Sequence, residues 1–168
     1  MRWALILIFL FVAARASAFE IKSESFLNGA DIGSKYTCDA DNVSPEISWI
    51  DAPDKTQSFA LICDDPDSPS GTWTHWIIFN IPKEKTSLKE NLPTIGTFDD
   101  GMIQGRNDFG KTGYYGPCPP YGTHRYFFKL YALDVELLLD ENSSKEDLLE
   151  RMQGHVLGQT QMYCKYQR

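Results

Sequence analysis

The chain has 168 residues and an excess of acidic side chains: 23 Asp and Glu against 16 Lys and Arg, a formal net charge of −7. No basic run is longer than a pair. Nucleic acids and anionic lipid surfaces attract proteins through clustered Lys and Arg. The composition therefore argues against nucleic acid as a partner and against unassisted binding to an anionic membrane.

The first 18 residues have the organisation of a signal peptide. Arg2 supplies a positive charge, residues 3–14 are apolar, and Ala16-Ser17-Ala18 is a small-x-small cleavage site before Phe19. The apolar run is shorter than the ~20 residues of a membrane span, and an uncleaved anchor is the alternative. We expect a signal peptide over 1–18 and one exported domain over 19–168, periplasmic or secreted, with no transmembrane segment after cleavage. Cleavage removes two of the 16 basic residues and makes the net charge −9.

Four cysteines in an exported chain favour disulfides over metal ligation, and none of them has a Cys-x-x-Cys spacing. Cys38 and Cys118 lie in segments of turn-forming composition. Cys63 ends an apolar strand, and Cys164 lies in a predicted terminal strand. Pairing loop with loop and strand with strand gives Cys38–Cys118 and Cys63–Cys164. The other connectivities stay open, as does a buried free thiol at Cys63.

Short segments rich in β-branched and aromatic residues predict strands. Those at 58–64 and 75–81 are almost continuously apolar, which indicates central strands covered on both faces. Pro, Gly and Asn clusters separate the segments. The predicted strands are Ile47–Ile50, Ser58–Asp64, His75–Ile81 and Tyr126–Leu133. This pattern predicts a mainly β sandwich with peripheral helices.

One segment near the C-terminus predicts a helix. Ser143 and Glu146 form a capping box at its start, Gly154 weakens its middle and Gly158 ends it. A shorter helical turn is expected over residues 86–91. The predicted apolar face of the main helix is Leu148, Leu149, Met152, Val156 and Leu157.

The loop at 64–72 carries closely spaced carboxylates on a stiff backbone. Asp65 and Asp67 flank a proline, and Pro69 stiffens the exit. These carboxylates could serve as ligands or could simply cap turns through nearby backbone N–H groups. Alternation in the next strand predicts one face with Trp73, His75 and Ile77, and an opposite face with Thr74, Trp76 and Ile78. His75 has a structural alternative too, a packing role beside a carboxylate.

A second loop, residues 113–122, also runs directly into a strand. Its glycines and prolines are Gly113, Gly116, Gly122, Pro117, Pro119 and Pro120. Glycines permit backbone conformations in which successive N–H groups converge on an anion. His124 and Tyr126 then share one face of the following strand, and Arg125 lies on the other. Two rigid loops that each deliver a histidine indicate a small-anion pocket.

The two loops together resemble the phosphatidylethanolamine-binding protein (PEBP) family, also called the Raf kinase inhibitor protein family, and most of all its bacterial YbhB/YbcL-like branch. The motifs that carry the resemblance are Asp65-Pro66-Asp67-Ser68-Pro69, Trp73-x-His75-Trp76, Asn107 to Tyr114, and Gly116-Pro117-Cys118-Pro119-Pro120-x-Gly122-x-His124-Arg125-Tyr126. The resemblance covers the whole predicted mature chain.

The resemblance implies a mainly β, antiparallel β-sandwich with small peripheral helices, including one C-terminal helix. It also implies a surface pocket for phosphate, phosphorylethanolamine or a similar anion. The residues expected to line or support that pocket are Asp65, Asp67, Pro69, Trp73, His75, Gly116, Pro119, Pro120, His124 and Tyr126.

These observations predict an exported, non-enzymatic protein that binds a small anion or a phospholipid headgroup, without a cofactor or metal. It could also modulate a protein partner, for example a kinase, through the same pocket. The alternative is a phosphoester hydrolase or metal-dependent enzyme that uses the Asp and His cluster. No Gly-x-Ser-x-Gly nucleophile motif and no His-x-x-x-His metal pair is present in the sequence.

Carboxylates beside a bound anion repel it, at a cost of about 1–4 kcal/mol at close range. We expect protonated histidines and backbone N–H groups to offset this repulsion. A neighbouring carboxylate raises the pKa of a histidine, so Asp65 and Asp67 are expected to keep His75 or His124 protonated. Alternatively, one aspartate meets the ammonium group of an ethanolamine headgroup.

Overall fold

The computed structural model describes residues 18–168, so the predicted signal peptide lies outside the described residues apart from its last one. The strands are β1 (Glu20–Lys22), β2 (Ile47–Ile50), β3 (Ser58–Asp65), β4 (Trp73–Pro82), β5 (Ser87–Leu88), β6 (Ile103–Gln104), β7 (Thr123–Leu133) and β8 (Val156–Gln167). A 3₁₀ turn, η1, covers Ser34–Tyr36, and the α-helix α1 covers Lys145–Met152. Among these residues no helix is long and apolar enough to span a membrane.

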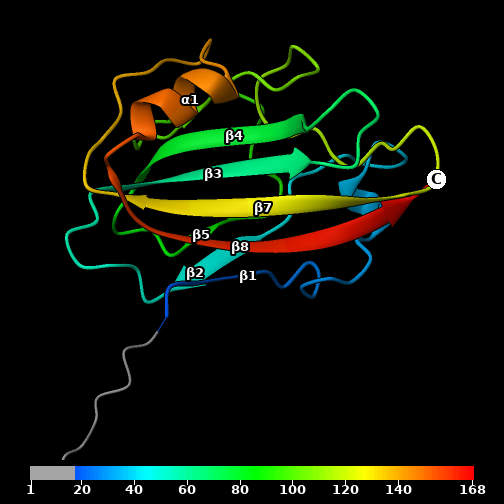
Figure 1. The fold of residues 1–168 in the computed structure, drawn as a ribbon, viewed down its shortest axis with the longest axis horizontal. Coiled ribbons are helices and arrows are strands. Elements are labelled where there is room, and N and C mark those ends of the chain that lie inside the picture. Colours follow the sequence, from blue (N-terminus) through cyan, green and yellow to red (C-terminus); the bar gives the residue numbers. More distant parts are fainter. Residues whose placement is uncertain (1–17) are drawn as a thin grey trace, which may run out of the picture.

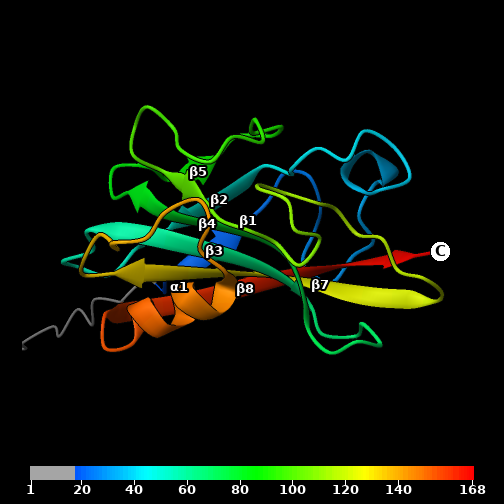
Figure 2. The same ribbon diagram turned by 90° about the horizontal axis from the view of Figure 1, so that it is seen from above.

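The strands form two antiparallel sheets stacked as a sandwich. The larger sheet has the order β6-β4-β3-β7-β8, and the smaller one has the order β1-β2-β5. Helix α1 lies on the outer face of the larger sheet, on the side away from the smaller sheet (Figures 1 and 2). The predicted fold class, a mainly β antiparallel sandwich with small peripheral helices, is therefore confirmed.

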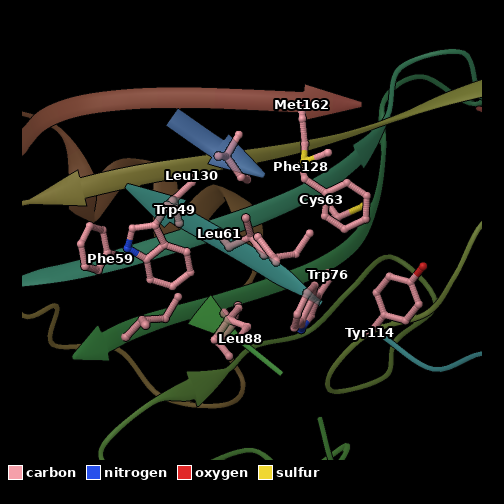
Figure 3. Close-up of a cluster of buried hydrophobic side chains, with 14 of the residues drawn as sticks. Trp49, Phe59, Leu61, Cys63, Trp76, Leu88, Tyr114, Phe128, Leu130 and Met162 are labelled. Atoms are coloured by element: carbon pink, nitrogen blue, oxygen red, sulfur yellow. The ribbon is translucent and has the colours of Figure 1, made fainter. Parts of the chain in front are cut away.

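Two apolar layers hold these elements together. The layer between the sheets includes Trp49 from the smaller sheet and Trp76 and Phe128 from the larger one (Figure 3). The layer between the larger sheet and α1 includes Ile77 and Leu148. Because both faces of the larger sheet are covered, all eight residues of its central strand β3 are buried. This explains the continuous apolar runs that the sequence places in β3 and β4.

The four predicted strands are confirmed, and β3, β4 and β7 extend beyond their predicted ends. The predicted turn at 86–91 is wrong, because residues 87–88 form β5. Leu88 pairs with Ile47 of β2 and is almost completely buried. The backbone of a segment this short is ordered by its neighbour in the sheet, which its local sequence does not reveal.

The C-terminal helix exists, but its cap and its end differ from the prediction. The N-cap is Ser144, and its capping-box partner is Asp147. The helix ends at Met152, and Gly154 adopts a positive φ of 81° in the turn that follows. The predicted helical positions Val156 and Leu157 lie in β8 instead, which pairs with β7 along its whole length.

The disulfide prediction is half right. Cys38 and Cys118 form a disulfide, whereas Cys63 and Cys164 are both free and buried. Cys63 lies in β3 and Cys164 in β8, and strand β7 runs between them. Neighbouring strands are about 4.8 Å apart, so two strand spacings exceed the ~4.4–6.8 Å Cα separation of a disulfide. The two thiols share the layer between the sheets without being able to join.

Candidate functional site

A pocket of about 180 Å³ opens where the ends of β3, β4 and β7 meet the two Pro- and Gly-rich loops. Its lining residues are Asp65, Ser68, Pro69, Ser70, Trp73, His75, Phe109, Cys118 and Pro120. Both loops that the sequence singled out therefore contribute to one pocket, although 40 or more residues separate them. A third loop adds Phe109.

Asp65 and His124 form a buried pair at the base of the pocket. The Nδ1 atom of His124 lies 2.7 Å from Oδ2 of Asp65, and both side chains are about 5% exposed. The other carboxylate oxygen of Asp65 accepts a hydrogen bond of 2.9 Å from the backbone N–H of Asp67. The carboxylate of Asp65 thus has a hydrogen-bond partner at each oxygen.

His75 occupies an unusual position in β4. Cys63 pairs with Trp76 and Asp64 pairs with Thr74, so His75 is an extra residue in a β-bulge. The bulge overturns the predicted alternation. The ring of His75 packs edge-on against Tyr126, which belongs to the same apolar layer as Trp76 rather than to that of Ile77.

The Nδ1 atom of His75 lies 2.6 Å from the carbonyl oxygen of Tyr115. A carbonyl oxygen can only accept, so Nδ1 carries the hydrogen, and the other ring nitrogen, Nε2, is the one available to a ligand. Burial lowers the pKa of His75, and this outweighs the opposing effects of the Tyr115 carbonyl and the Asp65 carboxylate. This shift disfavours the protonated form of His75, whereas the sequence predicted a protonated His75 or His124; for His124 that expectation stays a prediction.

Aromatic rings form one wall of the pocket. Phe109 lies edge-on to both Trp73 and His75, with ring centroids 5.6 and 5.2 Å apart, and it also packs on Tyr115. The side-chain oxygen of Asn107 accepts the backbone N–H groups of residues 109 and 111, which fixes the tight loop that presents Phe109. The indole N–H of Trp73 is buried and has no hydrogen-bond partner among the described residues.

Asp67 points away from the pocket. Both of its carboxylate oxygens contact the guanidinium of Arg125, at 2.6 and 2.8 Å, and one also accepts the backbone N–H of Arg125. These hydrogen bonds lower the pKa of Asp67. Asp67 therefore ties the first loop to β7 through Arg125. The neighbouring Asp64 lies on the other face of the sheet, paired with Lys129 and Lys145.

The second loop is held by its glycines in a way that differs from the predicted anion nest. The N–H of Gly116 donates to Oδ1 of Asn42 at 2.7 Å, and the N–H of Gly122 donates to the carbonyl of Arg168. Both donors are already used within the protein. A Cβ at Gly116 would lie only 2.0 Å from the carbonyl oxygen of Tyr36, so this glycine permits a close approach of two backbones.

The pocket contains half of the predicted site residues. Those that line it are Asp65, Pro69, Trp73, His75 and Pro120. His124 and Tyr126 support it from behind, while Asp67, Gly116 and Pro119 are not among the lining residues. The lining residues that the prediction missed are Ser68, Ser70, Phe109 and Cys118. Ser68, Phe109 and Cys118 lie inside the motifs quoted above, and Ser70 directly follows one of them, so the motifs were the available signal.

The described residues, 18–168, contain no group of three or more His, Cys, Asp or Glu side chains placed so that they could hold a metal ion. The buried Asp65–His124 pair and the ring of His75 are the ionisable groups at the pocket. The pocket can therefore offer hydrogen bonds to a small ligand beside an aromatic wall.

Known proteins resemble this chain over nearly its whole length. The family model for "Phosphatidylethanolamine-binding protein" matches residues 22–167. A UPF0098 protein of Methanothermobacter thermautotrophicus is 55% identical over 148 residues, which cover 88% of this chain and 98% of the relative. A UPF0098 protein of Aquifex aeolicus is 45% identical over 168 residues, which cover 98% of each chain.

Two solved structures share the fold. One is a putative phosphatidylethanolamine-binding protein homolog, CT736, from Chlamydia trachomatis, with a TM-score of 0.82 and 37% identity over 90% of this chain and 98% of the other. The second is YbcL from E. coli, described as a new member of the mammalian PEBP family, with a TM-score of 0.81 and 31% identity over 90% and 99%. The resemblance inferred from the two loops is confirmed, and the chain belongs to the phosphatidylethanolamine-binding protein family.

Proposed function

We propose that this protein is an exported, non-enzymatic binding protein whose pocket takes a small anion, either phosphate or a phosphoethanolamine-type headgroup. The observation that carries the proposal is the pocket itself. His75 lines it, with one ring nitrogen fixed by a carbonyl and the other available to a ligand, and Asp65, which also lines it, is paired with His124. The pocket volume of about 180 Å³ suits a headgroup and excludes a whole lipid.

Anion binding favours protonation of His75, and protonation of His75 favours anion binding. In the free protein the pKa of His75 lies below its ordinary value of 6.5, so the ring is neutral at pH 7. A nearby anion raises that pKa, and the protonated ring donates a charge-assisted hydrogen bond from Nε2. Between the lower pKa of the free protein and the higher pKa of the complex, binding takes up a proton. Affinity therefore increases as the pH falls through this window.

Export is supported by the signal-peptide pattern of residues 1–18 and by the Cys38–Cys118 disulfide, because disulfides persist in oxidising compartments. Mass spectrometry of the protein from its native host tests this part of the proposal. The expected mature N-terminus is Phe19. An intact Met1 on protein recovered from the cytosol would contradict export.

The binding test is isothermal titration of residues 19–168, which contain every described helix and strand, with sulfate, phosphate and phosphoethanolamine. Sulfate does not titrate near neutral pH, so any proton taken up with it belongs to the protein. The matched variants are His75→Asn and His155→Asn, since His155 lies in the exposed turn after α1, paired with Asp134. We expect affinity to fall at least about tenfold in His75→Asn and to stay unchanged in His155→Asn.

Affinity for sulfate is expected to be higher at about pH 5.5 than at about pH 8, with uptake of about one proton. Saturable binding that survives His75→Asn unchanged would place the ligand elsewhere. No binding of any of the three ions by folded, disulfide-linked protein would reject the anion pocket. Release of phosphate from phosphoethanolamine during the titration, proportional to protein concentration, would contradict the non-enzymatic assignment.

A further inference from the structure

Two Asn-x-Ser triplets in this chain match the acceptor sequence for asparagine-linked glycosylation, in which x is any residue except proline. They are Asn42-Val43-Ser44 and Asn142-Ser143-Ser144. Such a triplet is a modification site only in an exported protein and only where the asparagine lies at the surface. The structure places the two asparagines in very different surroundings.

Asn42 takes part in the packing around the second pocket loop. Its side-chain oxygen accepts the 2.7 Å hydrogen bond from the N–H of Gly116. Ser44, the third residue of this triplet, is 2% exposed, and its hydroxyl oxygen accepts the N–H of Leu92. A sugar on the amide nitrogen of Asn42 would crowd the contact with Gly116. The fold therefore disfavours glycosylation of the first triplet.

Asn142 lies in the loop between β7 and α1, and it is exposed (Figure 1). The backbone of this loop is fixed, because the N–H of Asn142 donates to Oδ1 of Asp140 at 2.8 Å and the N–H of Ser143 donates to the Asp140 carbonyl. Among residues 18–168 the side-chain amide of Asn142 has no hydrogen-bond partner. The loop thus presents an unengaged amide nitrogen to solvent.

A shallow hollow of about 570 Å³ lies next to Asn142, between the loop and the start of α1. Leu138, which lines it, is 90% exposed although it is apolar. Asp140 and Asp147 also line it, and each has one carboxylate oxygen without a partner among the described residues. Apolar surface beside carboxylate acceptors suits a sugar, whose ring has C–H faces and whose hydroxyl groups donate hydrogen bonds.

We propose that Asn142 is glycosylated, and that the first sugars lie over this hollow and cover Leu138. The proposal rests on the export proposed above. The donor is an oligosaccharide joined to a lipid through phosphate. A bond forms between Nδ2 of Asn142 and C1 of the first sugar, the bond from C1 to the phosphate oxygen breaks, and the lipid phosphate leaves. The amide nitrogen gives up one proton, and no oxidant or reductant is needed.

Ser144, the third residue of the second triplet, has two separable roles. Its hydroxyl oxygen caps α1 by accepting the N–H of Asp147 at 3.2 Å. The same hydroxyl group completes the acceptor triplet, which requires Ser or Thr. Asn is as good an N-cap as Ser but does not complete the triplet. Ser144→Asn therefore keeps the helix cap and removes the glycosylation signal, whereas Ser144→Thr keeps both.

The test is peptide mass spectrometry of the protein from its native host, with three variants expressed there. Asn142→Gln and Ser144→Asn remove the second triplet, and Ser144→Thr is the matched control. We expect the parent chain and Ser144→Thr to carry the added mass of an oligosaccharide on Asn142, and the other two variants to lose it completely. Asn42 is expected to be unmodified in all four chains. Because Ser144→Asn and Ser144→Thr both cap α1, we expect both to remain folded in circular dichroism.

The N-terminus read in the same spectra separates this proposal from export. A mature chain that begins at Phe19 and carries an unmodified Asn142 would overturn the proposal and leave export standing. A chain that keeps Met1 and an unmodified Asn142 would contradict export, and the proposal with it. An oligosaccharide on Asn42 in place of Asn142, or one that persists on Asn142 in folded Ser144→Asn, would also overturn the proposal.

Discussion

Replacing Gly116 by alanine tests the packing of the second pocket loop. The added Cβ would lie 2.0 Å from the carbonyl oxygen of Tyr36 and 2.9 Å from Oδ1 of Asn42. The backbone of Tyr36 and the hydrogen-bonded side chain of Asn42 cannot move aside as easily as an unrestrained side chain could. The segments around Tyr36 and Gly116 must therefore separate, and the 2.7 Å hydrogen bond from the Gly116 N–H to Asn42 must stretch or break.

The expected loss of stability combines two terms. Forcing a methyl group into a packed site costs about 1–3 kcal/mol. Losing a partly buried hydrogen bond adds about 0.5–1.5 kcal/mol. Gly116→Ala should thus lower the free energy of unfolding by about 2–4 kcal/mol. Anion binding should weaken as well, because the neighbouring residue, Tyr115, supplies the carbonyl that holds His75.

Urea unfolding of residues 19–168, followed by tryptophan fluorescence, measures this change. Gly110→Ala is the control, because Gly110 has a positive φ of 69° but nothing within 4 Å of its added Cβ. That variant reports backbone strain alone, about 1–2 kcal/mol. If Gly116→Ala loses no more stability than Gly110→Ala, the close approach of the two backbones is not what this loop requires.

Two further predictions concern the cysteines. Cys63 and Cys164 should resist a thiol reagent in the native protein and react as two thiols once it is unfolded, because burial raises the pKa of Cys63 and raises that of Cys164 to about 12. No reactive thiols after unfolding would instead indicate a second disulfide. Removing the first disulfide with Cys38→Ser and Cys118→Ser should lower the free energy of unfolding by about 2–4 kcal/mol in urea, because the bond closes a long loop. A double variant as stable as the parent would contradict this.

The sequence was most informative where local pattern and tertiary environment agree. The continuous apolar runs in β3 and β4 predict central strands because both faces of that sheet are covered. The end of α1 shows the limit. Val156 and Leu157 continue the helical spacing of apolar residues, yet they lie in β8, which pairs with β7, a strand more than 20 residues earlier. The local spacing of apolar residues does not show whether a segment continues a helix or pairs with a distant strand.

The candidate site, like the fold, was predictable where the local sequence determines it and not where contacts between distant segments determine it. The two loops predict the position of the pocket, because rigid Pro- and Gly-rich segments that carry histidines are visible in the sequence. The contacts that the site residues make within the protein were not predictable. Asp67 is turned away by Arg125, and His75 is turned inward by a bulge that depends on its register with β3. The separation of Cys63 from Cys164 by a whole strand is likewise a matter of sheet order, which residue spacing does not encode.

The most direct test of the anion pocket is a ¹H–¹⁵N NMR titration of the tryptophan indole groups with phosphate. Residues 19–168 contain three tryptophans, and only Trp73 lines the pocket. Trp49 lies in the layer between the sheets, and the indole of Trp76 donates to Gln104. We expect the Trp73 signal to shift in a saturable way, more at about pH 5.5 than at about pH 8, while the other two stay in place. An unshifted Trp73 signal at millimolar phosphate would contradict the account.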